Sequence, residues 1–172
     1  MYNGFYRLAD RLARALAYAG GAVLVVIIVL NCISIIGRAF VPLDIGIGPI
    51  RGIYDITEIA MAAAIFAFLP WAQLRETHAK VDLFQSFMAP RFDQTLDLLF
   101  NIAMAMIAAV GTWRLYLGML DKYGYGETTL IAQIPVWQGY AAGLVGAVGF
   151  VIISLFCVLR SGRRLAGLGT EG

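Results

Sequence analysis

Glu58 is the residue whose type and position best suit chemistry, because it is an acidic residue in an apolar stretch. A carboxylate inside a membrane span is costly to bury and is a functional candidate by default. Such a group would suit a proton- or cation-coupled transporter. Glu58 lies, however, less than one turn into its expected helix and close to Asp55. We therefore favour a structural carboxylate at interfacial depth, hydrated or paired with a Lys or Arg of a partner.

The remaining polar residues of the apolar stretches have commoner structural explanations. Arg114 lies toward the outer end of its stretch and can extend to the lipid head groups, with anion coordination as the alternative. Asn31 and Ser34 suit hydrogen bonds between helices. The sequence has one histidine, His78, and two cysteines in apolar surroundings, too few for a haem held by two histidines or a zinc site.

No paired carboxylates, nucleophile constellation or phosphate-binding glycine loop can be assembled from the sequence. We therefore expect no catalytic residue, no metal or cofactor, and no substrate-binding site within this chain. The net charge of +2 is too small to suggest a nucleic-acid partner.

The composition predicts a membrane protein. Hydrophobic residues make up 60% of the chain and charged residues 14%, whereas soluble domains have roughly 45–50% and 25%. A spanning helix needs about 20 mostly apolar residues, and it must be helical because lipid cannot satisfy open backbone groups. Four stretches meet this requirement, at residues 15–37, 56–74, 98–120 and 136–159. The first is too long for the core of a signal peptide and is expected to be retained. The prediction is an all-α integral membrane protein forming one domain, residues 1–172.

The distribution of Lys and Arg predicts the orientation, because cytoplasmic segments carry the excess. With the N-terminus inside, one group of cationic residues is cytoplasmic: Arg7, Arg11, Arg14, Arg75, Lys80, Arg91, Arg160, Arg163 and Arg164. The smaller group, on the other side, is Arg38, Arg51, Arg114 and Lys122. Both termini are therefore expected in the cytoplasm.

Two short amphipathic segments are candidates for helices that lie on the membrane. Residues 5–14 place charged side chains on one face and apolar ones on another, which is typical of an interfacial helix among anionic lipids. A simple extension of the first span into the cytoplasm has equal weight. Residues 81–88 have the same pattern, and a helix there would hold the second and third spans apart.

Small residues recur along the fourth stretch, where Gly139, Gly143 and Gly146 follow helical spacing. Such a strip allows another helix to approach closely, which is a main source of helix association in lipid. The third stretch has a weaker version. The partner helix could belong to this chain or to another subunit, and we expect a partner subunit.

Two groups of motifs resemble the small membrane subunit of tripartite ATP-independent periplasmic (TRAP) transporters. The first comprises Leu69-Pro70, Arg75, His78, Val81-Asp82-Leu83 and Pro90, and Glu58 matches an acidic residue often found early in the second helix of that family. The second is Leu130 to Trp137, which is similar to a Leu-x-Ile-Pro-x-Trp motif before the fourth helix. The chain departs from the pattern in the longer interval after Leu130 and in Ala79, where a branched apolar residue is usual.

The resemblance implies a multi-pass protein of the bacterial inner membrane. A large permease subunit is expected to contain the substrate and sodium sites, and a periplasmic binding protein to deliver an organic acid. This chain would brace the permease in the bilayer. Glu58, Arg75, His78, Asp82, Pro135, Trp137 and the three glycines would then be structural or partner-contact residues, with Asp82 capping the interfacial helix and His78 at the head-group boundary.

Two other functions stay open at this stage. One is a self-sufficient four-helix exporter in which Glu58 exchanges protons for substrate. The other is a membrane anchor of a redox complex, which a single histidine disfavours. The transported substrate cannot be read from the sequence.

Overall fold

The computed structural model describes residues 2–43, 48–75 and 90–166, which are mainly long α-helices. These are α1 (Tyr2–Phe40), the 3-10 turn η1 (Val41–Leu43), α2 (Ile53–Leu74), α3 (Pro90–Tyr125) and α4 (Val136–Leu165). Each of the four α-helices is long and apolar enough to cross a membrane. The prediction of an all-α membrane protein with four spans is thus confirmed, and each expected span lies within one of these helices.

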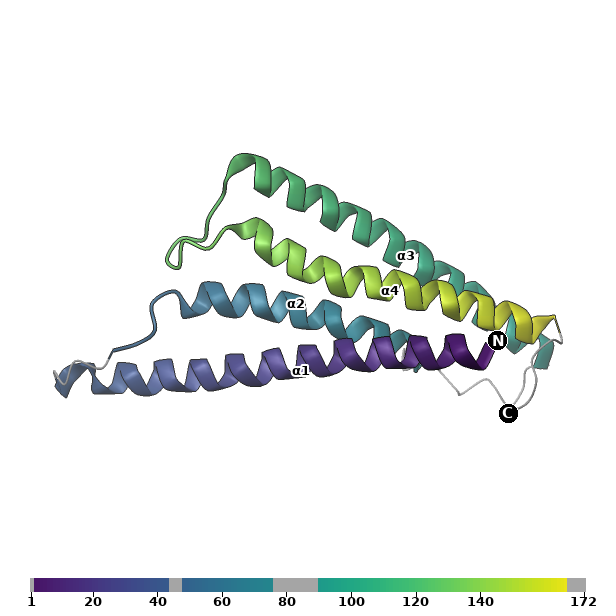
Figure 1. Cartoon of the computed structure of the whole chain (residues 1–172), viewed down its shortest axis with the longest axis horizontal. Coiled ribbons are helices and arrows are strands. Elements are labelled where there is room, and N and C mark those ends of the chain that lie inside the picture. Colours follow the sequence, from purple (N-terminus) through teal and green to yellow (C-terminus); the bar gives the residue numbers. More distant parts are fainter. Residues whose placement is uncertain (1, 44–47, 76–89, 167–172) are drawn as a thin grey trace.

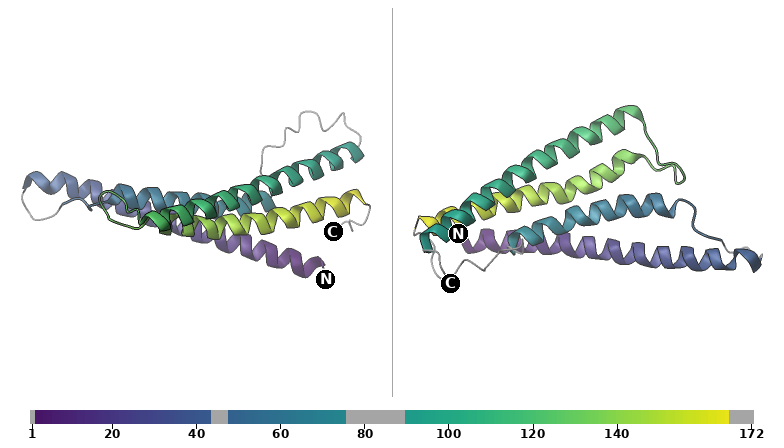
Figure 2. Two further views of the ribbon diagram at one scale, coloured as in Figure 1. Left: turned by 90° about the horizontal axis from the view of Figure 1, so that it is seen from above. Right: turned by 180° about the vertical axis from the view of Figure 1, so that it is seen from behind.

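The helices lie side by side in the order α3, α4, α2, α1 (Figure 1). Accordingly, α4 packs along both α3 and α2, and α2 packs along α1. The start of α1 and the end of α4 lie at one end of the molecule, which we call the terminal end, and the helices spread toward the opposite, open end (Figures 1 and 2). That the terminal end is cytoplasmic stays a prediction.

Residues 5–14 do not form a separate interfacial helix, so that expectation is corrected. They belong to α1, which runs unbroken for 39 residues, or about 58 Å at 1.5 Å per residue. The reason is burial: Ala9 and Ala13 are only 8% and 0% exposed, because this part of α1 packs on other helices. The alternative, an extension of the first span, is the one found. Residues 81–88 lie outside the described residues.

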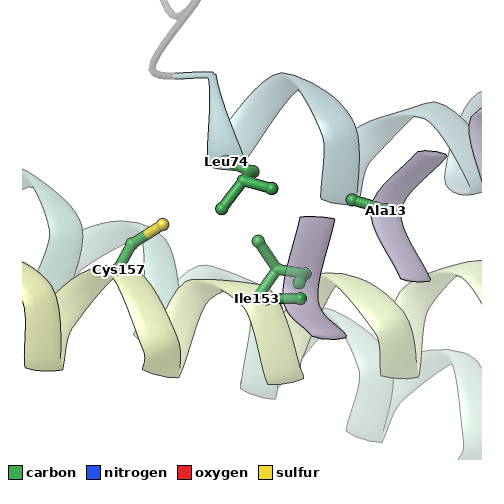
Figure 3. Close-up of a cluster of buried hydrophobic side chains, with 5 residues drawn as sticks. Ala13, Leu74, Ile153 and Cys157 are labelled. Carbon is green, nitrogen blue, oxygen red and sulfur yellow. The ribbon is translucent and has the colours of Figure 1, made fainter. Parts of the chain in front are cut away.

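A cluster of buried apolar residues lies at the terminal end, where three helices meet. Ala13 of α1, Leu74 of α2, and Ile153 and Cys157 of α4 point toward one another (Figure 3). Ala13, Ile153 and Cys157 are fully buried. Close packing of this kind contributes van der Waals contact between membrane helices, so this cluster joins α1, α2 and α4.

Polar contacts join α1 to α2 and to the segment just before α2, nearer the open end. The Asn31 side-chain amide donates to the Thr57 hydroxyl at 2.9 Å, and the backbone N–H of Ile50 donates to the Ser34 hydroxyl at 3.2 Å. Asn31 and Ser34 therefore serve helix packing, as their residue types predict.

The burial of the helices reflects their order in the layer. In the most apolar part of α4, 44% of residues are buried within the chain, against 17% in each of α1, α2 and α3. Large apolar side chains such as Ile28, Phe100 and Ile107 are about 61–63% exposed. The helices thus leave broad apolar faces, which suit lipid or another membrane protein.

Candidate functional site

A groove of about 660 Å³ lies between α2 and the α3–α4 pair toward the open end. Ile59, Phe66 and Leu115 line its apolar part. Its rim carries three carboxylates, from Asp55, Glu58 and Glu127. These three groups differ in what they contact: two have hydrogen-bond or ion-pair partners in the described chain, and one does not.

Glu58 is the carboxylate without such a partner among the described residues. Its side chain is exposed and makes no hydrogen bond or ion pair with another residue in the described ranges. Glu127, by contrast, pairs with Lys122. Glu58 therefore lies early in α2, as the sequence predicts, where a cationic group outside this chain can pair with its carboxylate.

Asp55 holds the connection between α3 and α4 against the start of α2. Its Oδ2 atom accepts the backbone N–H groups of Ile131 and Ala132 at 3.0 and 2.9 Å. The backbone at Gly52, in the left-handed region with φ +72°, passes so close to Ala132 that a Cβ atom there would lie 2.6 Å from the Ala132 Cβ. The sequence did not single out Asp55 for this role, because backbone donors leave no mark in a sequence.

The connection itself is a short hairpin-like turn. The Thr129 N–H donates to the Ile134 carbonyl at 2.9 Å, and the Thr129 hydroxyl accepts the Ile134 N–H at 3.1 Å. Pro135 caps the start of α4, where its fixed φ suits a helix beginning, and its carbonyl accepts the Gln138 N–H at 3.1 Å. Trp137 packs edge to face on Tyr123 of α3, with 5.6 Å between the ring centres. Pro135 and Trp137 thus act within the chain.

The glycine strip of α4 faces α2, which corrects the expectation that it would serve a partner subunit. A Cβ atom on Gly139 would lie 3.2 Å from Ile59, and one on Gly143 would lie 3.3 Å from Phe66. At Gly146 it would lie 2.4 Å from a backbone atom of Phe66. Small residues at these three positions allow α2 to approach α4 closely within the chain.

The weaker small-residue pattern of α3 is also used within the chain. Ala108 is 3% exposed, and the Thr112 hydroxyl donates to the Ala147 carbonyl of α4 at 3.3 Å. Arg114, on the same helix, is exposed, as expected for a cation that extends to the head groups.

A buried polar network links three helices at the terminal end. The Gln73 amide donates to the Asn101 carbonyl oxygen at 3.0 Å, and the Asn101 amide donates to the Ser161 hydroxyl at 2.9 Å. The three residues are 2%, 8% and 3% exposed, and Gln73 Oε1 has no partner in the described part of the chain. Sequence analysis missed this network. The available signal was three polar residues near the same ends of three apolar stretches.

Arg75 ends α2 at the terminal end, where its guanidinium carbon lies 4.5 Å from the centre of the Trp71 ring. His78 and Asp82, the other candidates near this end, lie outside the described residues. The sequence-predicted residues are therefore divided between the two ends of the molecule, with Glu58, Pro135 and Trp137 at the open end and Arg75 at the terminal end.

Comparison with known proteins places most of the chain in one family. The family model described as "Tripartite ATP-independent periplasmic transporters, DctQ component" matches residues 27–166. That range covers the last third or so of α1 and all of α2, α3 and α4. No curated protein and no solved structure matches the chain.

Proposed function

Because the chain belongs to the family of DctQ components of tripartite ATP-independent periplasmic transporters, we propose that it is the small scaffold subunit that braces the large permease. The family consists of transporter components and not of enzymes. Its complexes contain a large permease and a periplasmic binding protein, and the chain is a multi-pass protein of the inner membrane.

The observation that carries the scaffold role is the side-by-side arrangement of the helices. With α4 in contact with α3 and α2, and α2 with α1, the layer has two edges and broad exposed apolar faces. A layer of this kind widens a larger membrane protein without enclosing a substrate path of its own. Packing of small and apolar surfaces, rather than a hydrophobic driving force, holds such assemblies together in lipid.

Glu58 is proposed as a polar contact to the permease. It is exposed in the groove at the open end and forms no hydrogen bond or ion pair with another described residue. A Lys or Arg of the permease would complement it, and a paired carboxylate at the membrane boundary costs less than an unpaired one. Sodium coupling and organic-acid import complete the proposal, and both are assigned to the permease and the binding protein.

Co-expression with the large permease subunit of the same transporter tests the scaffold role. The two chains are expected to co-purify, and uptake of the organic acid delivered by the binding protein is expected to require both chains and a sodium gradient. The matched control is the permease expressed alone at the same level. Stable, functional import by the permease without this chain would contradict the proposal.

A second assay separates the scaffold from an autonomous exporter. The purified chain in liposomes is expected to move no substrate under a proton gradient, whether or not Glu58→Gln is introduced. Proton-driven transport by the chain alone that Glu58→Gln abolishes would overturn the scaffold role.

A further inference from the structure

Two arginines from different helices meet over one tryptophan at the terminal end. The guanidinium carbon of Arg75 lies 4.5 Å from the Trp71 ring centre, and that of Arg14 lies 5.5 Å from it. Both distances are within the range of about 6 Å at which a cation is attracted to an aromatic face. A guanidinium held in this way keeps N–H donors for other acceptors.

Among the described residues, one carboxylate pairs with these arginines, and it only partly neutralises them. Asp10 forms an ion pair with Arg14 at 2.8 Å, whereas its oxygen is 3.9 Å from Arg75, too far for a hydrogen bond. The Arg14 and Arg75 side chains are 50% and 45% exposed. Within the described part of the chain, the cluster therefore combines a net positive charge with donors that a ligand can reach.

The cluster also lies at a defined depth. The charge-free stretch of α1 begins at residue 15, directly after Arg14, and α2 ends at Leu74, directly before Arg75. Both arginines thus stand at the points where the apolar spans end. That level is where phospholipid phosphates lie, and tryptophan is enriched there because its ring is amphipathic.

We propose that Arg14 and Arg75, positioned on Trp71, bind the phosphate group of an anionic phospholipid. Guanidinium groups donate to phosphate oxygens in charge-assisted, often bidentate hydrogen bonds. Basic sites between membrane helices are a known form of lipid head-group site. Asp10 holds Arg14 in position on α1, whereas Trp71 and Arg75 lie at the end of α2, so the site exists only while α1 and α2 are packed together. This inference does not depend on the transporter role.

The test measures how the purified full-length chain retains phosphatidylglycerol, by native mass spectrometry after titration in phosphatidylcholine nanodiscs. The double variant R14Q/R75Q is expected to weaken retention by about tenfold or more, since each arginine near the head groups contributes about fivefold. The matched control R7Q/R11Q removes the same charge from exposed positions on α1 and is expected to change retention less than twofold. Equal losses in the two variants would mean diffuse attraction and would overturn the site.

Two further variants keep the inference testable. R14K/R75K preserves the charge but removes the planar donors, and it is expected to retain the lipid several-fold less well than the wild type. R75Q alone leaves the Asp10–Arg14 pair intact, so it provides a measurement even where the double variant does not fold. Wild-type retention in both variants would contradict a guanidinium site. Displacement of the lipid by millimolar inorganic phosphate would assign the site to free anions instead.

Discussion

The backbone of Phe66 in α2 lies against Gly146 in α4 so closely that a Cβ atom at residue 146 would come 2.4 Å from the Phe66 carbonyl carbon. The two helices therefore meet through main-chain atoms at this level. Close approach of this kind maximises van der Waals contact, which replaces the hydrophobic effect as the source of helix association in lipid.

Gly146→Ala is expected to force α2 and α4 apart and to lower the stability of the chain by about 1–3 kcal/mol, as overpacking does. Thermal unfolding of the purified protein in detergent measures the effect. Gly111→Ala is the matched control, because it is also a helical glycine but has nothing within 4 Å of the added atom. Equal destabilisation by the two substitutions would contradict the close approach.

Asp55→Ala is expected to loosen the turn between α3 and α4. It removes the acceptor of the Ile131 and Ala132 N–H groups, so both donors lose their partner within the chain. Hydrogen exchange of a peptide covering residues 127–135 should accelerate, because the turn opens more often when this contact to the start of α2 is lost. Asp121→Ala, exposed at the same end, serves as the control, and unchanged exchange in Asp55→Ala would refute the contact.

Gly52→Ala and Gly126→Ala form a pair that separates backbone strain from crowding. Both glycines have positive φ, +72° and +62°, but an added Cβ atom meets Ala132 at 2.6 Å only in the first. Gly126→Ala should cost about 1 kcal/mol for the left-handed conformation alone. Gly52→Ala should cost more, because the turn must also move. The ranking is read from melting temperatures, and a reversed order would exclude tight packing of the turn on α2.

Asn101→Ala is expected to destabilise the terminal end, because it leaves the Gln73 amide and the Ser161 hydroxyl without their partner. Hydrogen bonds between membrane helices contribute about 0.6–2 kcal/mol each. Thr112→Val removes a longer bond, at 3.3 Å, and should cost less. A double-mutant cycle of Gln73→Ala and Asn101→Ala in unfolding experiments should give a coupling energy above about 0.5 kcal/mol. Additive effects would mean that the network does not act as a unit.

The helices could be predicted from the sequence because each span is a long apolar stretch, and lipid allows an isolated chain segment few alternatives to a helix. Which helices pack against one another could not be predicted from the sequence. The glycine strip of α4 was recognised as a packing face, but a small side chain carries no information on which helix covers it. That helix is α2, through residues such as Phe66. The assignment of the strip to a partner subunit therefore did not foresee its contacts with α2 of the same chain.

Long-range polar contacts were missed for a related reason. Asp55 and Ala132 are 77 positions apart, and an N–H donor belongs to every residue except proline. The residues of the Gln73–Asn101 pair stand near span ends, where polar side chains ordinarily face water or head groups. Only the folded arrangement buries them together. Residue type and spacing singled out Glu58, Pro135 and Trp137, which lie at the open end, while the contacts that hold this end together required the structure.

The central position of α4 has a consequence for biosynthesis. It is the last of the four helices to leave the ribosome, yet α3 and α2 both pack on it. When α3 enters the bilayer, its main packing surface within the described chain has not been translated. The pair α1–α2 can form before then, but α3 gains its main partner within the described chain only when the final span is inserted.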